Sequence, residues 1–233
     1  MRCIDMYRTI KQAMLAAGIC LLVGSAQAAV IVSEVASWSS SNSAFMADWF
    51  ELTNTGAATV PITGWRVDDG SPTFATALAL NGITEILAGE SVIFVESDSP
   101  ATIVPAFKTA WFGASAPAGL RIGTYTGSGI GLSSNGDAVN IYNSAEVIQS
   151  AVTFGTADAS SPFQTFDNSA GATGAISLLS QVGVNGAFSA TAGGFTNVGS
   201  PGTITNVPEP TSAMLAVVAL GGLITFVKRR SAR

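Results

Sequence analysis

The sequence predicts one all-β domain with the architecture of a β-sandwich. Residues 29–206 contain many short segments rich in Val, Ile and aromatic side chains, and several of them alternate between apolar and polar positions. Gly, Pro and Asn residues suited to turns separate these segments. No stretch between residues 30 and 207 shows a sustained helical period with caps, so we expect no helix there. Many short strands joined by turns favour a sandwich.

The first strands are predicted from β-branched residues and from alternation. Residues 29–35 read AVIVSEV, which is short and β-branched. Residues 48–54 read DWFELTN. Successive side chains of a strand point to opposite faces, so this segment would have two distinct faces. One face carries Phe50 and Leu52, and the other carries Trp49, Glu51 and Thr53. The Asn-Thr-Gly sequence that follows, at 54–56, supplies a turn.

The next strands are predicted at 60–69 and 89–95, and Trp65 offers the first of these a large core anchor. Trp38 lies in the polar loop 37–42, and we expect it to contribute far less to stability than Trp65. Segments 138–142 and 147–154 flank residues 143–146, which is the spacing of a hairpin.

The last part of the body is rich in small residues. From Asn168 to Pro208 the chain has no charged residue at all. Residues 175–179 (AISLL) are a strand candidate that could complete the sandwich, and a linker is expected near Asn206.

Six sequence blocks of the body resemble the lamin tail domain. They are IVSEV at 31–35, DWFELTNTG at 48–56, ITGWRVDD at 62–69, AGESV at 88–92, LSSNGDAV at 132–139 and GSPG at 199–202. The resemblance implies an immunoglobulin-like β-sandwich that serves mainly as an interaction or targeting module. Two stretches depart from the family pattern: residues 37–47 form a longer first loop, and residues 97–131 look like an insertion.

The beginning of the chain, residues 1–28, has the pattern of a secretory signal peptide. Its basic n-region contains Arg2, Arg8 and Lys11, and an apolar stretch covers residues 13–23. Ala26 and Ala28 are small residues at the −3 and −1 positions of a cut after Ala28. Both cysteines, Cys3 and Cys20, precede this cut, so the mature body is predicted to be free of thiols and disulfides. An uncleaved N-terminal anchor is the alternative.

The end of the chain, residues 207–233, has three parts in order. A Pro-Glu-Pro triplet (Pro208, Glu209 and Pro210) precedes an apolar run at 213–227, and a basic cluster of Lys228, Arg229 and Arg230 follows it. Hydropathy alone indicates an ordinary membrane anchor, although the run is shorter than the roughly 20 residues that span a bilayer. The order of the parts resembles the PEP-CTERM sorting signal of Gram-negative bacteria. That resemblance implies an exosortase-type membrane protease that recognises the triplet and removes the tail at the cell surface.

The composition excludes several classes of function. The chain has no histidine, which excludes a Ser-His-Asp or Cys-His site and a conventional zinc site. Residues 29–207 contain thirteen acidic and three basic residues, a net charge of −10 that argues against nucleic acid as a partner. The glycines at 127, 129 and 131 have no Walker lysine beside them and indicate a turn.

Three groups of residues are candidates for chemistry, each beside a plainer interpretation. Asp68 and Asp69, with Asp137, could offer oxygens to Ca²⁺, but a solvated turn is the simpler interpretation. Glu34 and Glu51 could form a carboxylate pair of the glycosidase kind, but the resemblance places them in the framework of the sandwich. Aromatic side chains could form a carbohydrate surface or pack in the core; these are Trp38, Trp49 and Trp111.

The sequence therefore favours an exported, non-catalytic protein of the cell surface or extracellular matrix. It assigns no catalytic, cofactor-binding or metal-binding residue and no cofactor. The expected partners are an exosortase-type protease, the inner membrane transiently through 213–227, and an exopolysaccharide or another surface protein. The alternative is a secreted metal-dependent hydrolase of the nuclease or phosphatase type that holds its metal with Asp and Glu.

Overall fold

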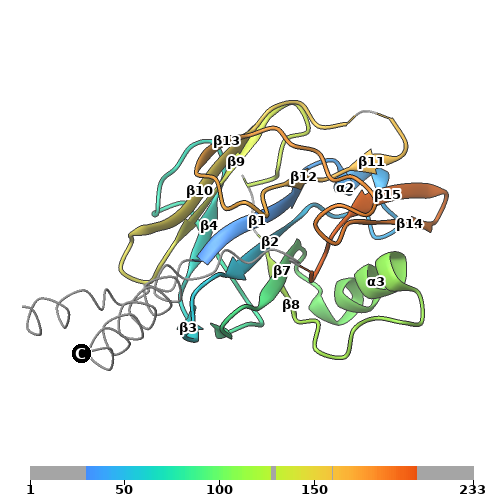
Figure 1. Cartoon of the computed structure of the whole chain (residues 1–233). Coiled ribbons are helices and arrows are strands. Elements are labelled where there is room, and N and C mark those ends of the chain that lie inside the picture. Colours follow the sequence, from blue (N-terminus) through green and yellow to red (C-terminus); the bar gives the residue numbers. More distant parts are fainter. Residues whose placement is uncertain (1–29, 127–129, 159, 204–233) are drawn as a thin grey trace, which may run out of the picture. The chain divides into compact units, whose positions relative to one another are not determined.

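Strand β1 (Val30–Ala36) lies near the middle of the first of two five-stranded sheets that pack against each other (Figure 1). The computed structural model describes residues 30–126, 130–158 and 160–203. The first sheet has the order β12-β1-β2-β7-β8, and its strands are antiparallel except for the β7–β8 pair. The other bounds are Phe166–Asp167 for β12, Trp49–Asn54 for β2, Ser91–Glu96 for β7 and Ile122–Tyr125 for β8.

The second sheet has the order β13-β10-β9-β4-β5 and is antiparallel except for the β10–β13 pair. Its strands are Gly174–Ile176 (β13), Ile148–Phe154 (β10), Asp137–Tyr142 (β9), Arg66–Asp68 (β4) and Leu78–Ala79 (β5). Phe154 of this sheet packs on Phe166 of the first, with ring centroids 5.2 Å apart. The result is consistent with the immunoglobulin-like sandwich that the sequence predicted.

The predicted faces of the strand at 48–54 are confirmed, but both are buried. Phe50 stacks on Phe94 of β7 and contacts Tyr125 of β8. On the opposite face, Trp49 makes edge contacts with Phe107 and Trp111, at centroid distances of 5.4 and 5.7 Å. Because apolar rings cover this face too, part of the first sheet is the middle of three layers.

Helix α3 (Pro100–Phe112) supplies much of this third layer and contradicts the expectation of a body without helices. Pro100 stands at the helix start, where its missing N–H costs nothing. Ile103, Phe107 and Trp111 recur every fourth residue and are all buried, so one face of the helix is apolar. The stretch 97–131, predicted to be an insertion, thus contains an element that covers the sheet.

A third, small sheet completes this layer. It contains β11 (Phe163–Gln164), β15 (Phe195–Gly199) and β14 (Phe188–Ala192), in that order. Phe188 packs against both Trp111 and Phe112 of α3, with centroids 5.7 and 5.6 Å apart. The late, charge-free part of the chain is therefore folded through β15.

The predicted hairpin at 143–146 is confirmed, since Asn143 N–H donates to the Val147 carbonyl oxygen over 2.9 Å and joins β9 to β10. The strand candidate at 175–179 corresponds to the slightly earlier β13, beside β10. A short antiparallel pair, β3 (Val60–Pro61) and β6 (Glu85–Ile86), accounts for the remaining strands.

The sequence prediction placed Trp38 in a polar loop where it would contribute little to stability, and this prediction is wrong. The residue precedes a single helical turn, α2 (Ser39–Asn42), and is only 1% exposed. Its indole Nε1–H donates to the Gln164 carbonyl oxygen over 2.7 Å, and its ring packs on Phe163. The polar neighbours suggested a solvated loop, but β11, more than 120 residues later, covers the ring. Trp65, in contrast, is buried as predicted.

Candidate functional site

The residues predicted for signal cleavage and sorting lie outside the described part of the chain. These are Ala26, Ala28, Pro208, Glu209, Pro210, Lys228, Arg229 and Arg230. The predicted apolar segments at 13–23 and 213–227 lie outside it as well. Within the ranges that the structure describes, no helix has the length and hydropathy needed to cross a membrane.

The two glutamates that the sequence offered as a carboxylate pair are brought together. Glu34 and Glu51 are cross-strand partners on β1 and β2, next to an irregularity in the register at Ser33. Both are buried, with 1% and 0% exposure. An ionised carboxylate in such a place is costly unless hydrogen-bond donors compensate for the lost water.

The donors to Glu34 come from the far end of the body. Its Oε1 accepts the Thr165 hydroxyl at 2.5 Å and the Ser200 N–H at 2.8 Å. Its Oε2 accepts the Ser200 hydroxyl at 3.2 Å. Glu34 therefore binds the segment that follows β15 through both a backbone and a side-chain donor.

Glu51 binds the same segment two residues later. Its Oε2 accepts the Gly202 N–H at 2.5 Å, and its Oε1 accepts the Ser33 hydroxyl at 2.7 Å. We call Glu34, Glu51, Ser200 and Gly202 the C-terminal clamp. The Gly-Ser-Pro-Gly block at 199–202 carried the family resemblance, but its spacing did not indicate that two buried carboxylates bind it.

Burial dominates the electrostatics of the clamp. Burial first, and the neighbouring Glu51 second, together raise the pKa of Glu34 to about 8, against the lowering effect of the Thr165 and Ser200 hydrogen bonds. Burial likewise raises the pKa of Glu51 to about 7, against the Gly202 and Ser33 donors. Near neutral pH the pair holds protons that two solvated glutamates would release.

This geometry supports a structural role for the pair. General acid–base chemistry requires a carboxyl group within hydrogen-bond reach of a substrate. The oxygens of Glu34 and Glu51 instead reach the chain's own amides and hydroxyls, under the 199–202 segment and away from solvent. They attach the end of the folded body to the centre of the first sheet.

The aspartates considered for Ca²⁺ accept backbone hydrogen bonds instead. Asp68 Oδ2 accepts the Thr73 N–H at 2.6 Å, and Asp69 Oδ1 accepts the Ser71 N–H at 3.0 Å. Asp137 accepts the Gly70 N–H at Oδ1 and the Ser133 N–H at Oδ2, both at 2.9 Å. In the described ranges no group of three or more His, Cys, Asp or Glu side chains is placed to hold a metal ion. The aspartates stabilise the turns around the start of β9.

The three tryptophans considered for a carbohydrate surface are buried: Trp38, Trp49 and Trp111. They belong to the aromatic packing of the third layer, so they offer no platform for a sugar ring in this conformation.

A buried acid that the sequence did not indicate is Asp48, immediately before β2. Its Oδ1 accepts the Ser40 N–H at 2.7 Å and so holds helix α2. Burial, with a smaller contribution from the nearby Glu96, raises its pKa to about 7 against the lowering effect of the Ser40 hydrogen bonds. Asp48 is the first residue of the predicted strand 48–54. The alternating pattern of that strand does not show whether a distant loop buries its first residue.

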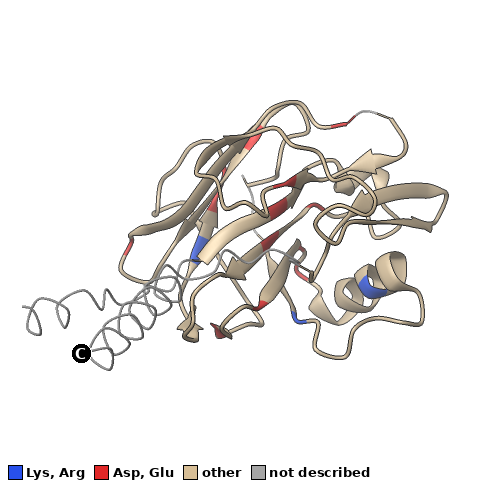
Figure 2. Cartoon of the chain, in the orientation of Figure 1, with Lys and Arg blue, Asp and Glu red and all other residues tan. Residues whose placement is uncertain are grey.

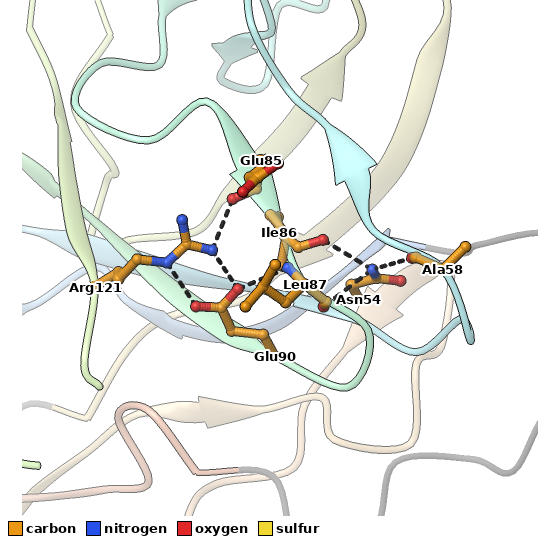
Figure 3. Close-up of polar contacts among 7 residues, drawn as sticks. All are labelled: Asn54, Ala58, Glu85, Ile86, Leu87, Glu90 and Arg121. Atoms are coloured by element: carbon orange, nitrogen blue, oxygen red, sulfur yellow. Dashed lines mark hydrogen bonds and ion pairs between the residues drawn. The ribbon is translucent and has the colours of Figure 1, made fainter. Parts of the chain in front are cut away.

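The one ion pair among the described residues lies at the β6–β7 turn (Figure 3). Arg121 donates through Nε to Glu90 Oε1 at 2.6 Å, and its Nη2 pairs with Oε2 of the same carboxylate. Glu90 Oε2 also accepts the Leu87 N–H, while Asn54 Nδ2–H₂ donates to the Ala58, Ile86 and Leu87 carbonyl oxygens. These contacts hold the loops at this end of the sandwich.

The other charges of the described residues are scattered, and acidic residues far outnumber basic ones there (Figure 2). Arg66 stacks over the Phe74 ring at 4.9 Å, and Lys108 lies on α3. The three basic residues in the described ranges are dispersed and form no positive surface there for a phosphate backbone.

Comparison with protein families matches residues 24–156 to the lamin tail domain. The match includes strands β1 to β10 and helix α3, and it ends before the segment that carries β11 to β15. No curated protein matches the chain significantly.

Proposed function

This chain belongs to the lamin tail domain family, and on that premise we propose that it is a non-catalytic interaction module exported to the cell surface or extracellular matrix. The match covers more than half of the chain, and the family is in general non-enzymatic.

The observation that carries a non-catalytic role is the C-terminal clamp. Glu34 and Glu51 are the carboxylate pair that the sequence offered for acid–base chemistry, and they are enclosed and hydrogen-bonded to Ser200 and Gly202. The Asp68, Asp69 and Asp137 carboxylates are similarly engaged by backbone amides. The buried glutamates and the turn aspartates therefore both stabilise the fold, and the fold presents the proposed binding surface.

The proposed route of export rests on the two ends of the chain. A signal peptide with Ala26 and Ala28 at the cut would direct the chain across the inner membrane. The Pro208-Glu209-Pro210 triplet, the apolar run and the basic Lys228-Arg229-Arg230 cluster would hold it there until an exosortase-type protease removes the tail. An exopolysaccharide or another surface protein is the proposed partner of the mature body.

Intact mass measurement of the exported protein tests the route. In a host that has an exosortase, we expect the loss of residues 1–28 and of the segment beyond the triplet. Recovery of the C-terminal Lys228-Arg229-Arg230 from mature protein would contradict the sorting signal and leave a plain membrane anchor.

A binding screen tests the role of the body. Residues 29–206 should bind the host's exopolysaccharide or a protein displayed with it. An assay of the same preparation for phosphatase and nuclease activity with added Mg²⁺, Mn²⁺ or Ca²⁺ provides the comparison. Metal-dependent turnover that is lost on substituting Asp68 or Asp137 would overturn the non-catalytic role.

A further inference from the structure

The loop between β13 and β14, residues 177–187, exposes three aliphatic side chains. Leu178, Val182 and Val184 are 56%, 63% and 46% exposed, whereas most aliphatic residues of this domain are buried. We call residues 177–187 the exit loop, because it lies where the described chain ends. An added Cβ at Gly186 would meet the Thr203 Cγ2 at 2.8 Å, so Thr203 runs directly beside the loop.

The exit loop has a defined conformation. Gly183 N–H donates to the Ala187 carbonyl oxygen, and Ala187 N–H donates to that of Val184, both at 2.8 Å. On its two sides the loop is joined to Asp167 of β12, whose N–H donates to the Leu178 carbonyl oxygen and whose Oδ2 accepts the Asn185 amide. The backbone that carries the exposed aliphatic residues is therefore held in place and is not a long unstructured stretch.

The charge distribution sets this part of the surface apart. Residues 29–207 have a net charge of −10, yet residues 168–207 contain no charged side chain. A body of that charge is repelled by an anionic lipid surface, and the repulsion is weakest where charges are missing. Asp167, the nearest acidic residue in sequence, is 7% exposed and hydrogen-bonded to Ser169 N–H and Asn185.

The tether to the membrane is short. Nine residues, 204–212, separate Thr203 from the start of the apolar run at Ala213. Fully extended, they reach about 30 Å. While the tail is embedded, the surface around Thr203 is therefore confined close to the bilayer, which gives even a weak contact a high effective concentration.

We propose that the exit loop is a lipid-contacting surface, through which Leu178, Val182 and Val184 hold the folded body against the bilayer as long as the tail is attached. The inference rests on the proposed membrane insertion of residues 213–227. It adds that the body has a fixed membrane-facing side. Removal of the tail would then release the body, because three aliphatic side chains alone supply a small apolar area.

The test uses residues 29–233, which contain neither the predicted signal peptide nor a cysteine, reconstituted in vesicles of phosphatidylethanolamine and phosphatidylglycerol. A polarity-sensitive dye is attached at Val182→Cys or at Val184→Cys. The matched control is Val147→Cys, because Val147 is similarly exposed, at 54%. It lies beside the first residue of β10, whereas the last residue of β10, Phe154, pairs with Ile176 just before the exit loop. The control is therefore at the far end of the strand from the loop. Unchanged far-ultraviolet circular dichroism establishes that each variant is folded.

We expect brominated lipid to quench the dye at 182 and 184 and to leave the dye at 147 unchanged. Adding Leu178→Asp to the Val184→Cys chain should abolish the quenching while the chain still floats with the vesicles. Flotation without quenching at 182 and 184 would overturn the lipid contact but leave the membrane anchor intact. A failure to float would contradict the anchor itself. Equal quenching at 147 would also overturn the proposal. Energy transfer between labelled copies that survives dilution with lipid would overturn it in favour of contact between two copies.

Discussion

Glu34 and Glu51 face each other across β1 and β2, and their carboxylates accept the backbone N–H groups of Ser200 and Gly202. Two buried acids at the centre of a sheet thus bind the last folded residues of the domain. The arrangement makes the stability of the fold, and the attachment of its C-terminal end, depend on the protons that the pair holds.

The clamp predicts that stability falls as pH rises from about 4.5 to about 8. The pKa of Glu34 rises from 4.5 to about 8 on folding and that of Glu51 to about 7, so the folded chain keeps protons that the unfolded chain has released. Asp48, raised from 3.8 to about 7, acts in the same direction. Each full proton of difference changes the free energy of unfolding by about 1.4 kcal/mol per pH unit. Urea titrations of residues 29–206 across this range measure the slope.

The Glu34→Gln and Glu51→Gln double variant should flatten that slope, because the amides have no proton to release. Glu146→Gln is the matched control, since Glu146 is an exposed residue of the hairpin turn, and it should leave the slope unchanged. A wild-type stability that rises between pH 5 and pH 8 would contradict the buried, protonated pair.

Gly199 gives a steric test of the same region. A Cβ there would lie 2.5 Å from Glu34 Oε1, 3.0 Å from the Trp111 ring and 3.1 Å from Thr165 Cγ2. Gly199→Ala should therefore cost about 1–3 kcal/mol, as overpacking of a filled interior does. Gly155→Ala is the control, because its Cβ would meet nothing within 4 Å, and it should be neutral or slightly stabilising. Equal denaturation midpoints for the two variants would show that residues 199–202 are not packed on the clamp.

Trp65 and Trp38, two of the four buried tryptophans, should be similarly important to stability. Replacing either by Ala removes a large buried ring, and each substitution should cost roughly 3–5 kcal/mol. Trp38→Ala also leaves the Gln164 carbonyl oxygen without its indole donor. Denaturant midpoints of the two variants measure the costs. A Trp38→Ala variant as stable as the wild type would restore the solvated loop expected from the polar sequence around it.

Removal of divalent metal should leave the thermal midpoint of residues 29–206 nearly unchanged. Asp68, Asp69 and Asp137 accept backbone N–H groups and so stabilise their turns without a metal ligand. A Ca²⁺ site filled at 100 times its dissociation constant would add about 2.7 kcal/mol. A midpoint several degrees higher in millimolar Ca²⁺ than in EDTA would therefore establish a site at these aspartates.

Local pattern was enough to predict several strands and their faces. The alternation at 48–54 placed Phe50 and Leu52 opposite Trp49 and Glu51, and the hairpin at 143–146 follows from turn chemistry between two apolar segments. Helix α3 was missed although Ile103, Phe107 and Trp111 carry its period. Pro105 and the small residues around it obscured this helical period. The helix becomes evident only in the structure, where its Phe107 packs on the Trp49 ring.

The amino-acid sequence by itself determined the class of the fold, the resemblance of its strand blocks to the lamin tail domain, and the absence of histidine. The tertiary structure alone decided what covers the outer face of the first sheet and what the two buried glutamates do. The reason is separation along the chain: Glu34 meets Thr165 and Ser200 across 131 and 166 residues, and Trp38 meets Gln164 across 126. An alternating sequence pattern indicates which side of a strand a residue occupies. Only the packed chain decides whether that side meets water or another layer.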